Sequence, residues 1–216
     1  MIKVDLHIHS EYSRDSLLSF EAIIATCQWR GIGCVAITDH NTIAGALAFK
    51  RIAPFPVIVG EEIKTTAGEI TGLFLSQEIP KGLSPQETID RIKEQGGLVY
   101  IPHPFSRARR SILRRAVLEE IVPQIDIVEA FNSRILLGRE NERARRFAQE
   151  HGLPCGAGSD AHTAYEIGRA YVEMEEFEGE EDFLRNLAQG QVVGQLTVPL
   201  IHIITSLMKV YKKFGG

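Results

Sequence analysis

The stretch Val4-Asp5-Leu6-His7-Ile8-His9 decides how this chain is interpreted, because it places two histidines where an apolar run ends. Residues two apart on an extended strand point the same way, so the side chains of His7 and His9 can reach one metal ion, whereas a helix would separate them. A histidine considered alone is more often a hydrogen-bonded core or surface residue than a ligand. The pair therefore needs partners elsewhere in the chain.

Three further clusters of histidine and aspartate supply such partners, and each follows an apolar run. They are Thr38-Asp39-His40-Asn41, Ile101-Pro102-His103-Pro104 and Ser159-Asp160-Ala161-His162. Together the four clusters hold five of the seven histidines of the chain. Because imidazole and carboxylate are the ligands that hold zinc, manganese or iron, we expect a multinuclear metal site.

One pattern occurs three times and predicts the fold. A helical stretch ends at a glycine, a short apolar run follows, and the run ends in candidate ligands, as from Gly31 to His40, from Gly96 to His103 and from Gly152 to His162. This is typical of a return from helix to strand. Helices are expected over 19–29, 41–51, 84–95 and 136–151. Alternating strands and helices favour a largely parallel sheet, and ligands from so many strand ends converge only if that sheet closes into an α/β barrel.

Length and composition fit one domain. A chain of 216 residues and 24.1 kDa can bury a sizeable core, and we expect a single domain over 1–216. The net charge of −4 gives no general attraction to nucleic acid, so no stable nucleic-acid complex is expected. Three cysteines without close pairing fit a reduced compartment, and the N-terminal residues lack signal-peptide character, so a cytoplasmic location is expected.

The segment 198–214 is apolar and then basic. It is too short and too interrupted to span a bilayer, so no transmembrane segment is expected. We interpret it as a C-terminal helix packed on the barrel, with an interfacial helix or a dimer contact as alternatives. The sequence leaves the oligomeric state open.

With these clusters in place, the chain resembles the polymerase and histidinol phosphatase (PHP) family of metal-dependent phosphoesterases. The matching pieces, in the family's order, are Asp5-Leu6-His7-Ile8-His9-Ser10, Ser13-Arg14-Asp15, Thr38-Asp39-His40-Asn41, Gly60-Glu61-Glu62-Ile63, Pro102-His103-Pro104 and Ser159-Asp160-Ala161-His162. The resemblance implies a distorted (β/α)7 barrel with the metal site at the C-terminal ends of the strands. It also implies two or three divalent ions, with manganese, zinc and iron all compatible with such ligands.

The resemblance assigns the ligands position by position. One ion would be held by His7, His9, Glu62 and Asp160. Glu62 would bridge to a second ion held by His103, and a third would be held by Asp15, His40 and His162. Glu62 is selected over Glu61 by the family pattern, and Asp39 is expected to orient a neighbouring imidazole. Glu62, His103 and Asp160 are the predicted catalytic groups.

One position departs from the family pattern. Many members carry a further histidine on the strand after the glutamate, and here the residue is Thr71 in Gly68-Glu69-Ile70-Thr71-Gly72. The second ion is therefore expected to be weakly held or completed by water. Glu69 is a conceivable substitute, although a solvated turn residue is the preferred interpretation of it.

The expected activity is hydrolysis of a phosphoester by a metal-bridging hydroxide. Arg107, in the loop after His103, is the nearest candidate clamp for phosphate, and Asn132 at another strand end could touch the substrate. The substrate would be a small phosphorylated metabolite, a nucleotide or an oligonucleotide phosphate, and the sequence does not choose among them. Two alternatives stay open: amide or ester hydrolysis by the same centre, and a non-catalytic, metal-stabilised interaction module.

Overall fold

The computed structural model describes residues 1–109, 111–198 and 201. Its sheet contains nine strands in the order β7-β6-β5-β4-β3-β2-β1-β8-β9. The strands are β1 Ile2–Ile8, β2 Cys34–Ile37, β3 Val57–Thr65, β4 Gly68–Leu73, β5 Leu98–Ile101, β6 Ile127–Asn132, β7 Cys155–Gly158, β8 Ala170–Met174 and β9 Gln191–Gly194. Almost all of the segment 198–214, predicted to be a helix, lies outside the described residues.

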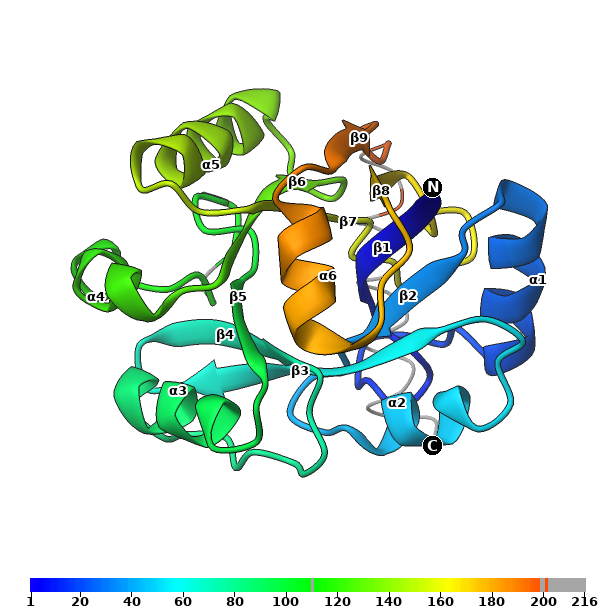
Figure 1. Cartoon of the computed structure of the whole chain (residues 1–216), viewed down its shortest axis with the longest axis horizontal. Helices are drawn as coiled ribbons and strands as arrows, with labels where there is room; N and C mark the ends of the chain where they lie inside the picture. Colours follow the sequence, from blue (N-terminus) through cyan, green and yellow to red (C-terminus); the bar gives the residue numbers. More distant parts are fainter. Residues whose placement is uncertain (110, 199–200, 202–216) are drawn as a thin grey trace.

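Helices α1 to α5 surround this sheet, and α6 lies across the middle of the view in Figure 1. They span α1 Phe20–Arg30, α2 Ala44–Lys50, α3 Pro85–Lys93, α4 Arg115–Ile121, α5 Gly138–Glu150 and α6 Gly179–Leu187, with a short 3-10 helix at Val122–Gln124. Helix α3 begins with a reciprocal capping box formed by Ser84 and Glu87, with Pro85 in the first turn. The four helices expected from the sequence are α1, α2, α3 and α5.

The strict alternation of strand and helix is interrupted twice, because β3 leads directly into β4 and β7 is followed by β8 without a helix. Strands β1, β2 and β3 are parallel neighbours, and so are β5, β6 and β7, but β4 runs antiparallel to both β3 and β5. A two-residue turn at Thr66 and Ala67 joins β3 to β4 as a hairpin, so no crossover helix fits between them. The expected seven-fold β/α repeat therefore gives way to a mixed sheet in the middle of the chain.

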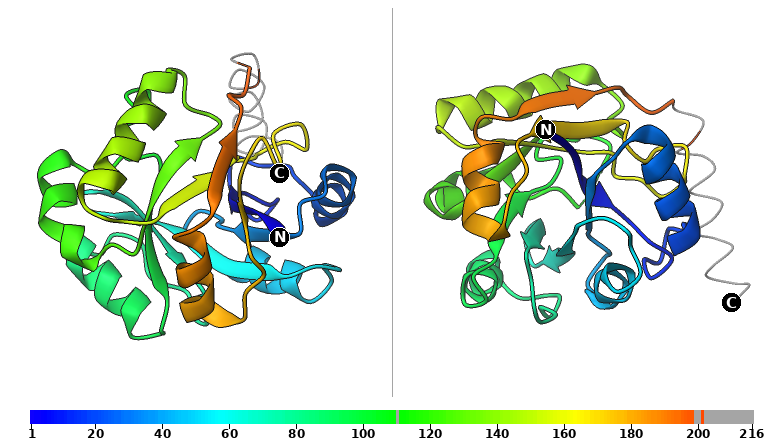
Figure 2. Two further views of the ribbon diagram at one scale, coloured as in Figure 1. Left: turned by 45° about the horizontal axis from the view of Figure 1, so that its top comes forward. Right: turned by 45° about the vertical axis from the view of Figure 1, so that its right-hand side comes forward.

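The sheet closes into a nearly complete barrel where β1 meets the end of β7. The amide of Asp160 donates to the carbonyl of His7 at 2.7 Å, and the amide of His9 donates to the carbonyl of Ala161 at 2.9 Å. At the N-terminal end of β1, β8 replaces β7 as its neighbour and pairs antiparallel with Ile2, Lys3 and Val4. Strand β9 follows on the outer side of β8, as both views of Figure 2 show.

Two hydrophobic clusters fix this arrangement. The barrel interior contains Val4, Leu6, Leu73, Tyr100 and further apolar residues, and Phe183 and Leu187 of α6 belong to the same cluster. Helix α6 therefore closes the floor of the barrel, at the end opposite the C-terminal edge of the parallel strands. A second cluster packs the outer face of the sheet against the surrounding helices.

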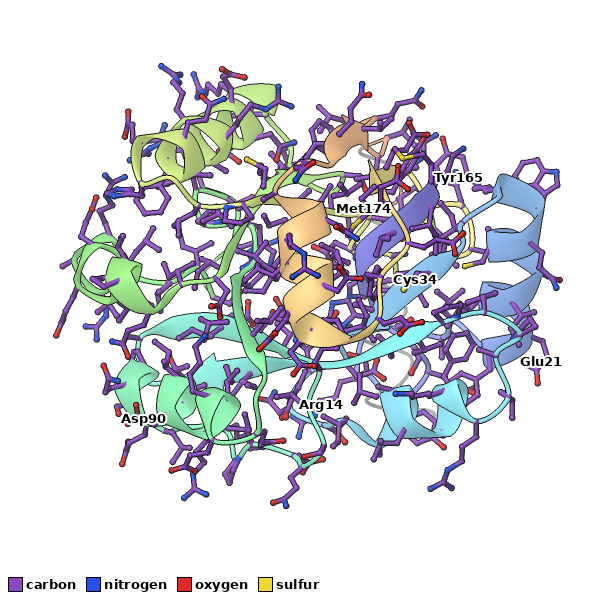
Figure 3. All side chains as sticks on the ribbon, viewed as in Figure 1. Arg14, Glu21, Cys34, Asp90, Tyr165 and Met174 are labelled. Carbon is purple, nitrogen blue, oxygen red and sulfur yellow. The ribbon has the colours of Figure 1, made fainter. Side chains whose placement is uncertain are left out.

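The side chains follow this layering. Cys34 and Met174 are buried inside the barrel, whereas Glu21 on α1 and Asp90 on α3 point outward (Figure 3). Cys27, Cys34 and Cys155 are free thiols. None of the helices in the described part of the chain has the length and apolar character that crossing a bilayer would take.

Candidate metal centre

The two histidines of β1 face the barrel interior because the strand is irregular. Leu6 packs in the interior cluster and Ile8 in the outer cluster, and the pairing of β1 with β2 shifts register between Asp5 and Ile8. Such a bulge re-aims the side chains that follow it. As a result His7 and His9 are both fully buried above the apolar interior, with their Nε2 atoms 3.1 Å apart.

Strict alternation along β3 separates the two neighbouring glutamates. Ile58 packs inside the barrel and Val59 and Ile63 pack outside, so Glu62 faces inward and Glu61 outward. The Oε1 atom of Glu62 lies 3.0 Å from Nε2 of His103, and its Oε2 atom lies 3.0 Å from Nδ1 of His40. Glu61 instead accepts a hydrogen bond from the amide of Ile79 at 2.9 Å.

All eight residues predicted as ligands lie in one cluster at the C-terminal end of the barrel. Their ligand atoms form four overlapping groups, and within each group the atoms lie within 4.8 Å of one another. The groups are His9, Asp15, His40 and His162; His7, Glu62 and His103; His7, His9 and Asp160; and His40, Glu62 and Glu69. All nine side chains except His40 are buried.

The chemistry of this cluster fits metal ions. Oε2 of Glu62 and Oδ1 of Asp160 are buried oxygens without a hydrogen-bond donor. Both face imidazole nitrogens, with Nε2 of His9 3.4 Å from Glu62 and 3.5 Å from Asp160. Buried carboxylates cost several kcal/mol unless a cation compensates them, roughly as for any buried charge. Imidazoles beside carboxylates form the mixed nitrogen and oxygen donor set that zinc, manganese and iron accept.

The electrostatics keep both carboxylates charged. Burial alone would raise the pKa of Glu62, but His40, His7 and His103 outweigh it and hold that pKa well below its usual range. Burial alone would also raise the pKa of Asp160, but Arg109 and His7 outweigh it and hold that pKa well below its usual range. Burial, together with His162 and His40, lowers the pKa of His9 to about 3, so its ring stays neutral, as a ligand requires.

Two of the predicted ligands have a backbone conformation that side-chain-bearing residues rarely adopt. His103 has φ of 31° and Asp160 has φ of 54°, each just beyond the end of its strand. A non-glycine residue in this left-handed region is strained, and the surrounding structure must impose it. Hydrogen bonds from their own amides do so here, from His103 to Glu129 and from Asp160 to the carbonyl of His7.

A second layer of polar residues holds the ligands in place. Asp5 accepts hydrogen bonds from the amides of Ser159 and Gly168, both at 2.9 Å. Asp39 was expected to orient an imidazole, but its two oxygens accept from the amide and hydroxyl of Ser10, at 2.7 and 2.6 Å. It therefore fixes the loop that follows His9. Sequence reasoning missed Glu129, a buried carboxylate in the otherwise apolar run of β6.

The arginines near the cluster differ from the expected clamp. Arg107 is exposed, and in the described part of the chain only its backbone amide makes a hydrogen bond, to Glu140. Arg109, two residues on, reaches the cluster and pairs with Oδ2 of Asp160. Arg134, which the sequence did not single out, is buried next to Nδ1 of His162 and lies 3.2 Å from Glu166. Two guanidinium groups therefore line the centre.

Asn132 lies inside the protein. Its side-chain amide donates to Oδ2 of Asp160 and to Oε2 of Glu129, both at 3.0 Å, and its own oxygen accepts from the amide of Arg134. The residue is fully buried, so in this conformation it orients Asp160 from behind.

Strand β4 differs most from the sequence-based expectation. Glu69 was interpreted as a solvated turn residue, but it is only 7% exposed and lies on the strand. Burial and the nearby Glu62 raise the pKa of its carboxyl group. The interpretation was wrong because the hairpin turn is shorter than the sequence suggested, which moves Glu69 from the turn into the barrel.

Fold and donor set together define a class of protein: barrels that gather histidine and carboxylate side chains at the C-terminal ends of their strands to hold metal ions. Residues 138–192 match the family model described as PHP-associated. An uncharacterized protein of Methanocaldococcus jannaschii is 41% identical over 178 residues, which cover 81% of this chain and 71% of that protein. The chain belongs to the PHP family, which confirms the resemblance seen in the sequence.

Solved structures support the same fold. A two-domain protein from Bacteroides vulgatus that contains a predicted PHP-like metal-dependent phosphoesterase matches with a TM-score of 0.71 and 16% identity, over 90% of this chain and 65% of that chain. An amidohydrolase from Chromobacterium violaceum matches with a TM-score of 0.60 and 17% identity, over 76% of this chain and 89% of that chain. The protein therefore has the barrel fold of PHP-like metal-dependent phosphoesterases and amidohydrolases.

Proposed function

We propose that the protein is a metal-dependent phosphoesterase. The observation that carries this proposal is the pairing of a buried cluster of imidazoles and carboxylates with two arginines at its edge, Arg109 and Arg134. The cluster suits divalent cations, and guanidinium groups suit the phosphate of a substrate that bridges to those cations.

We propose the ligand set in three parts. His7, His9, Glu62 and Asp160 would hold one ion, Glu62 and His103 a second, and Asp15, His40 and His162 a third. The groups of ligand atoms found within 4.8 Å of one another are compatible with this division. Ions bound there would stabilise negative charge on the phosphoryl oxygens and make a water molecule nucleophilic at neutral pH. Manganese, zinc and iron are the candidates.

The side chains of the protein would then divide the remaining work. Arg109 and Asp160 form a salt bridge in the barrel mouth. A cation at Asp160 would compete with the guanidinium, and the released Arg109 would be free to bind a phosphate oxygen. Arg107 on the exposed rim could add a more distant contact. Asn132 and Glu129 would hold Asp160, His7 and His103 in place throughout.

The substrate class we propose is a small phosphorylated metabolite or a nucleotide or oligonucleotide phosphate. Three free thiols support the proposal that the protein works in a reducing compartment such as the cytoplasm. The structural relative from Chromobacterium violaceum contains bound sulfate, a tetrahedral oxyanion like phosphate.

Amide or ester hydrolysis is the second candidate, because the same ions would also activate water toward a carbonyl. The amidohydrolase among the structural relatives favours it. The two arginines favour phosphate, because a neutral amide offers no charge for them to bind. A non-catalytic module stabilised by metal would require the ions but no substrate.

The deciding experiment uses the full chain loaded with manganese and a panel of phosphomonoesters, nucleoside bisphosphates, short oligonucleotides, amides and esters. We expect release of inorganic phosphate from at least one phosphoester. The Asp160→Ala and His9→Ala proteins should lose both the activity and bound metal, as measured by elemental analysis. Full metal content in His9→Ala would contradict the ligand assignment on β1. Hydrolysis confined to amides or esters would establish the second candidate instead.

A further inference from the structure

We propose that Glu69 is a metal ligand of this centre and takes the place of the histidine that the family pattern puts at Thr71. This inference rests on the proposed function, since it concerns the same ions. It depends on the hairpin of β3 and β4 and on the residues found there.

The alternation of β4 puts Glu69 on the inner face of the barrel. Leu73 packs in the interior cluster and Ile70 in the outer cluster, so Thr71 and Glu69 share the inner face with Leu73. Because β4 runs antiparallel to its neighbours, its first residues lie at the end where the parallel strands finish. Glu69 therefore stands at the level of the ligands, whereas Leu73 lies in the apolar floor.

The carboxylate of Glu69 lies among ligands and has an oxygen without a partner. Its ligand atom lies within 4.8 Å of those of Glu62 and His40. Its Oε2 atom is buried and accepts no hydrogen bond. The strand is pinned at this point by the amide of Glu69, which donates to the carbonyl of Ser111 at 2.8 Å. Two buried carboxylates side by side repel each other, and a cation between them removes that cost.

Thr71 is a weaker candidate for the same role. It pairs directly with Glu62 across the strands, and its hydroxyl is buried without a hydrogen-bond partner. A neutral hydroxyl stabilises a divalent ion far less than a charged carboxylate does. We therefore expect Glu69, rather than Thr71, to act as the ligand. An ion bound to Glu62 would then have the carboxylate of Glu69 within reach as a further ligand and would not depend on water alone.

The test compares Glu69→Gln with Glu61→Gln. Each variant replaces one buried carboxylate of the hairpin strands with an amide of the same shape. Only Glu69 faces the cluster of predicted metal ligands. Manganese binding is measured by calorimetry and by elemental analysis after dialysis. We expect Glu69→Gln to lower the affinity for one ion by at least about 10- to 100-fold, the range found when a group that supports metal ligands is removed. The affinity for the other ions should stay unchanged. Glu61→Gln should bind like the parent protein.

Thermal unfolding gives an independent readout. In the presence of a chelator, Glu69→Gln should unfold at a higher temperature than the parent, because the repulsion between the buried carboxylates of Glu69 and Glu62 is removed. With manganese, the rise in unfolding temperature should be smaller than in the parent, because a ligand is gone. Equal metal affinity and equal manganese response in Glu69→Gln and the parent would overturn the inference. A parent protein that binds no metal at all would instead overturn the proposed function.

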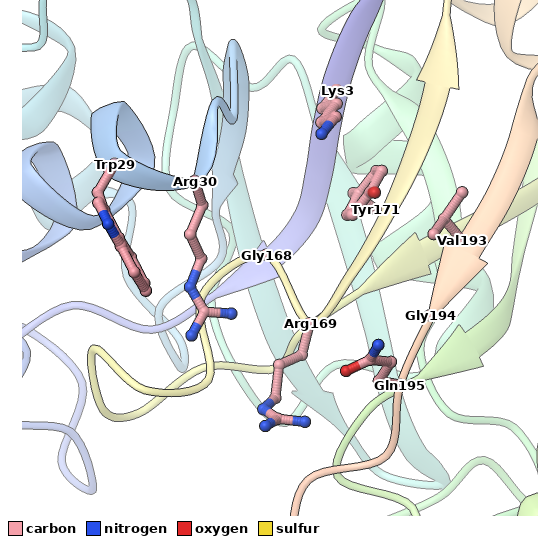
Figure 4. A pocket seen from close by; sticks show the side chains of 9 residues that line it. All are labelled: Lys3, Trp29, Arg30, Gly168, Arg169, Tyr171, Val193, Gly194 and Gln195. Carbon is pink, nitrogen blue, oxygen red and sulfur yellow. The ribbon is translucent and has the colours of Figure 1, made fainter.

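A second inference rests on a different part of the molecule. A hollow of about 320 Å³ lies outside the barrel, between the end of α1 and strands β1, β8 and β9 (Figure 4). It is lined by Lys3, Trp29, Arg30, Gly168, Arg169 and Tyr171, together with residues 193–195. Three of these side chains are cationic and none is acidic. We propose that this hollow, defined here as the α1 pocket, binds a small organic phosphate.

The cations of the α1 pocket are uncompensated. Within the described residues, Lys3, Arg30 and Arg169 form no ion pair, and the Nε atoms of both arginines are buried without a hydrogen-bond partner. The guanidinium groups are held in place by Tyr165, whose carbonyl accepts from Arg30 at 3.1 Å and whose hydroxyl accepts from Arg169. Three positioned cations around a hollow of this size match one phosphate ester.

The pocket also has an aromatic wall and a connection to the metal centre. The indole of Trp29 is 79% exposed, and the ring of Tyr171 lies under the ammonium of Lys3 at 5.2 Å. An exposed indole offers a face for the organic part of the ligand. Gly168 and Arg169 end the loop from β7 to β8, which also carries Asp160 and His162, so a ligand here would contact the segment that holds two of the proposed metal ligands.

Trp29 is the only tryptophan of the chain, so its fluorescence reports on this pocket directly. AMP, inorganic phosphate and adenosine are titrated into the protein in EDTA, which keeps the metal centre from binding phosphate through ions. We expect saturable changes with AMP and phosphate but none with adenosine. Arg169→Ala should weaken binding at least tenfold, whereas Arg109→Ala, at the metal centre, should leave it unchanged. Absence of saturation with both phosphates, or equal binding by Arg169→Ala, would overturn the proposal.

Discussion

Glu129 lies 3.0 Å from Nδ1 of His7, and the opposite nitrogen of the same ring, Nε2, faces Glu62 at 3.6 Å. Glu129 therefore orients the imidazole through Nδ1, and Glu62 lies on the opposite, Nε2 side of the ring. The other oxygen of Glu129 accepts from the amide of His103 at 2.6 Å. A single side chain on β6 thus positions two predicted ligands from two other strands.

This relationship predicts the effect of Glu129→Gln. An amide keeps the shape but removes the charge that favours the Nδ1 proton of His7, so the ring loses its fixed tautomer. We expect metal affinity to fall by about 10- to 100-fold. Calorimetric titration with manganese measures the change. Arg145→Ala on the surface of α5 is the control, and equal affinities in the two variants would contradict the role of Glu129.

Gly158 sets the distance between β7 and the ligands of β1. A Cβ atom at this position would collide with Cβ of His7 and lie 2.6 Å from Oε1 of Glu129. Gly158→Ala should therefore displace His7, destabilise the protein by about 1–3 kcal/mol and reduce metal binding. Urea unfolding and metal analysis test this. Gly152→Ala is a poor control because of its positive φ, so Gly138→Ala, with an open environment, serves instead and should change neither measurement.

Arg109 and Arg107 should differ in the reaction. The guanidinium of Arg109 reaches Asp160, whereas the side chain of Arg107 is exposed. We expect Arg109→Ala to lower kcat/KM for a phosphoester by roughly 10- to 150-fold, the equivalent of one charged hydrogen bond of about 1.5–3 kcal/mol. Arg107→Ala should raise KM modestly, and Arg145→Ala should change nothing. Steady-state kinetics at saturating manganese distinguish the three, and a larger effect from Arg107 would restore it as the main clamp.

Thr71→His should rescue a chain that lacks Glu69. The two residues share one face of β4, so an imidazole at 71 can replace the ligand lost in Glu69→Gln. Position 71 is fully buried, so the larger ring should cost about 1–3 kcal/mol of stability in the absence of metal. We expect the double variant to bind manganese more tightly than Glu69→Gln alone, measured by calorimetry. Failure of the rescue in a folded double variant would show that the site does not extend to position 71.

The capping box of α3 gives a prediction about pH. Hydrogen bonds from Ser84 hold the pKa of Glu87 below its usual range, so the folded state favours the carboxylate. Its contribution to stability is therefore present above the ordinary pKa of 4.5 and is lost as the pH falls. Ser84→Ala should cost roughly 0.5–2 kcal/mol at pH 7. The difference from the parent should shrink at pH 4, and a difference independent of pH would contradict the ionic part of the box.

Much of the fold follows from local sequence signals. The returns at Gly31, Gly96 and Gly152 each lead into a strand, and the capping residues Ser19 and Ser84 mark the starts of α1 and α3. These signals depend on a few neighbouring residues, so they can be recognised without tertiary information. The histidine pair of β1 could be recognised for the same reason, because strand periodicity acts over two residues.

The features that sequence reasoning missed depend on contacts between distant segments. The bulge in β1 is visible only in its pairing with β2, and the inward face of Glu69 follows from the length of the β3 to β4 turn. Glu129 is recognisable in the sequence as a charged residue inside an apolar run. That pattern does not predict which residues it contacts. The choice between Arg107 and Arg109 depends on how the loop after β5 folds over Asp160, which no local pattern encodes.

The junction of β1 with the end of β7 carries one more consequence. The residues that join the two segments through their backbones, His7, His9 and Asp160, are the same residues that would share an ion. Such an ion would act as a removable cross-link between the first strand of the barrel and the end of β7, and closing so long a loop is costly in chain entropy. By linkage, the free energy that the ion adds to closure equals the free energy that closure adds to ion binding. Stripping the ion should therefore loosen this seam first, with faster amide exchange at Asp160 than at the β2 to β3 pairing.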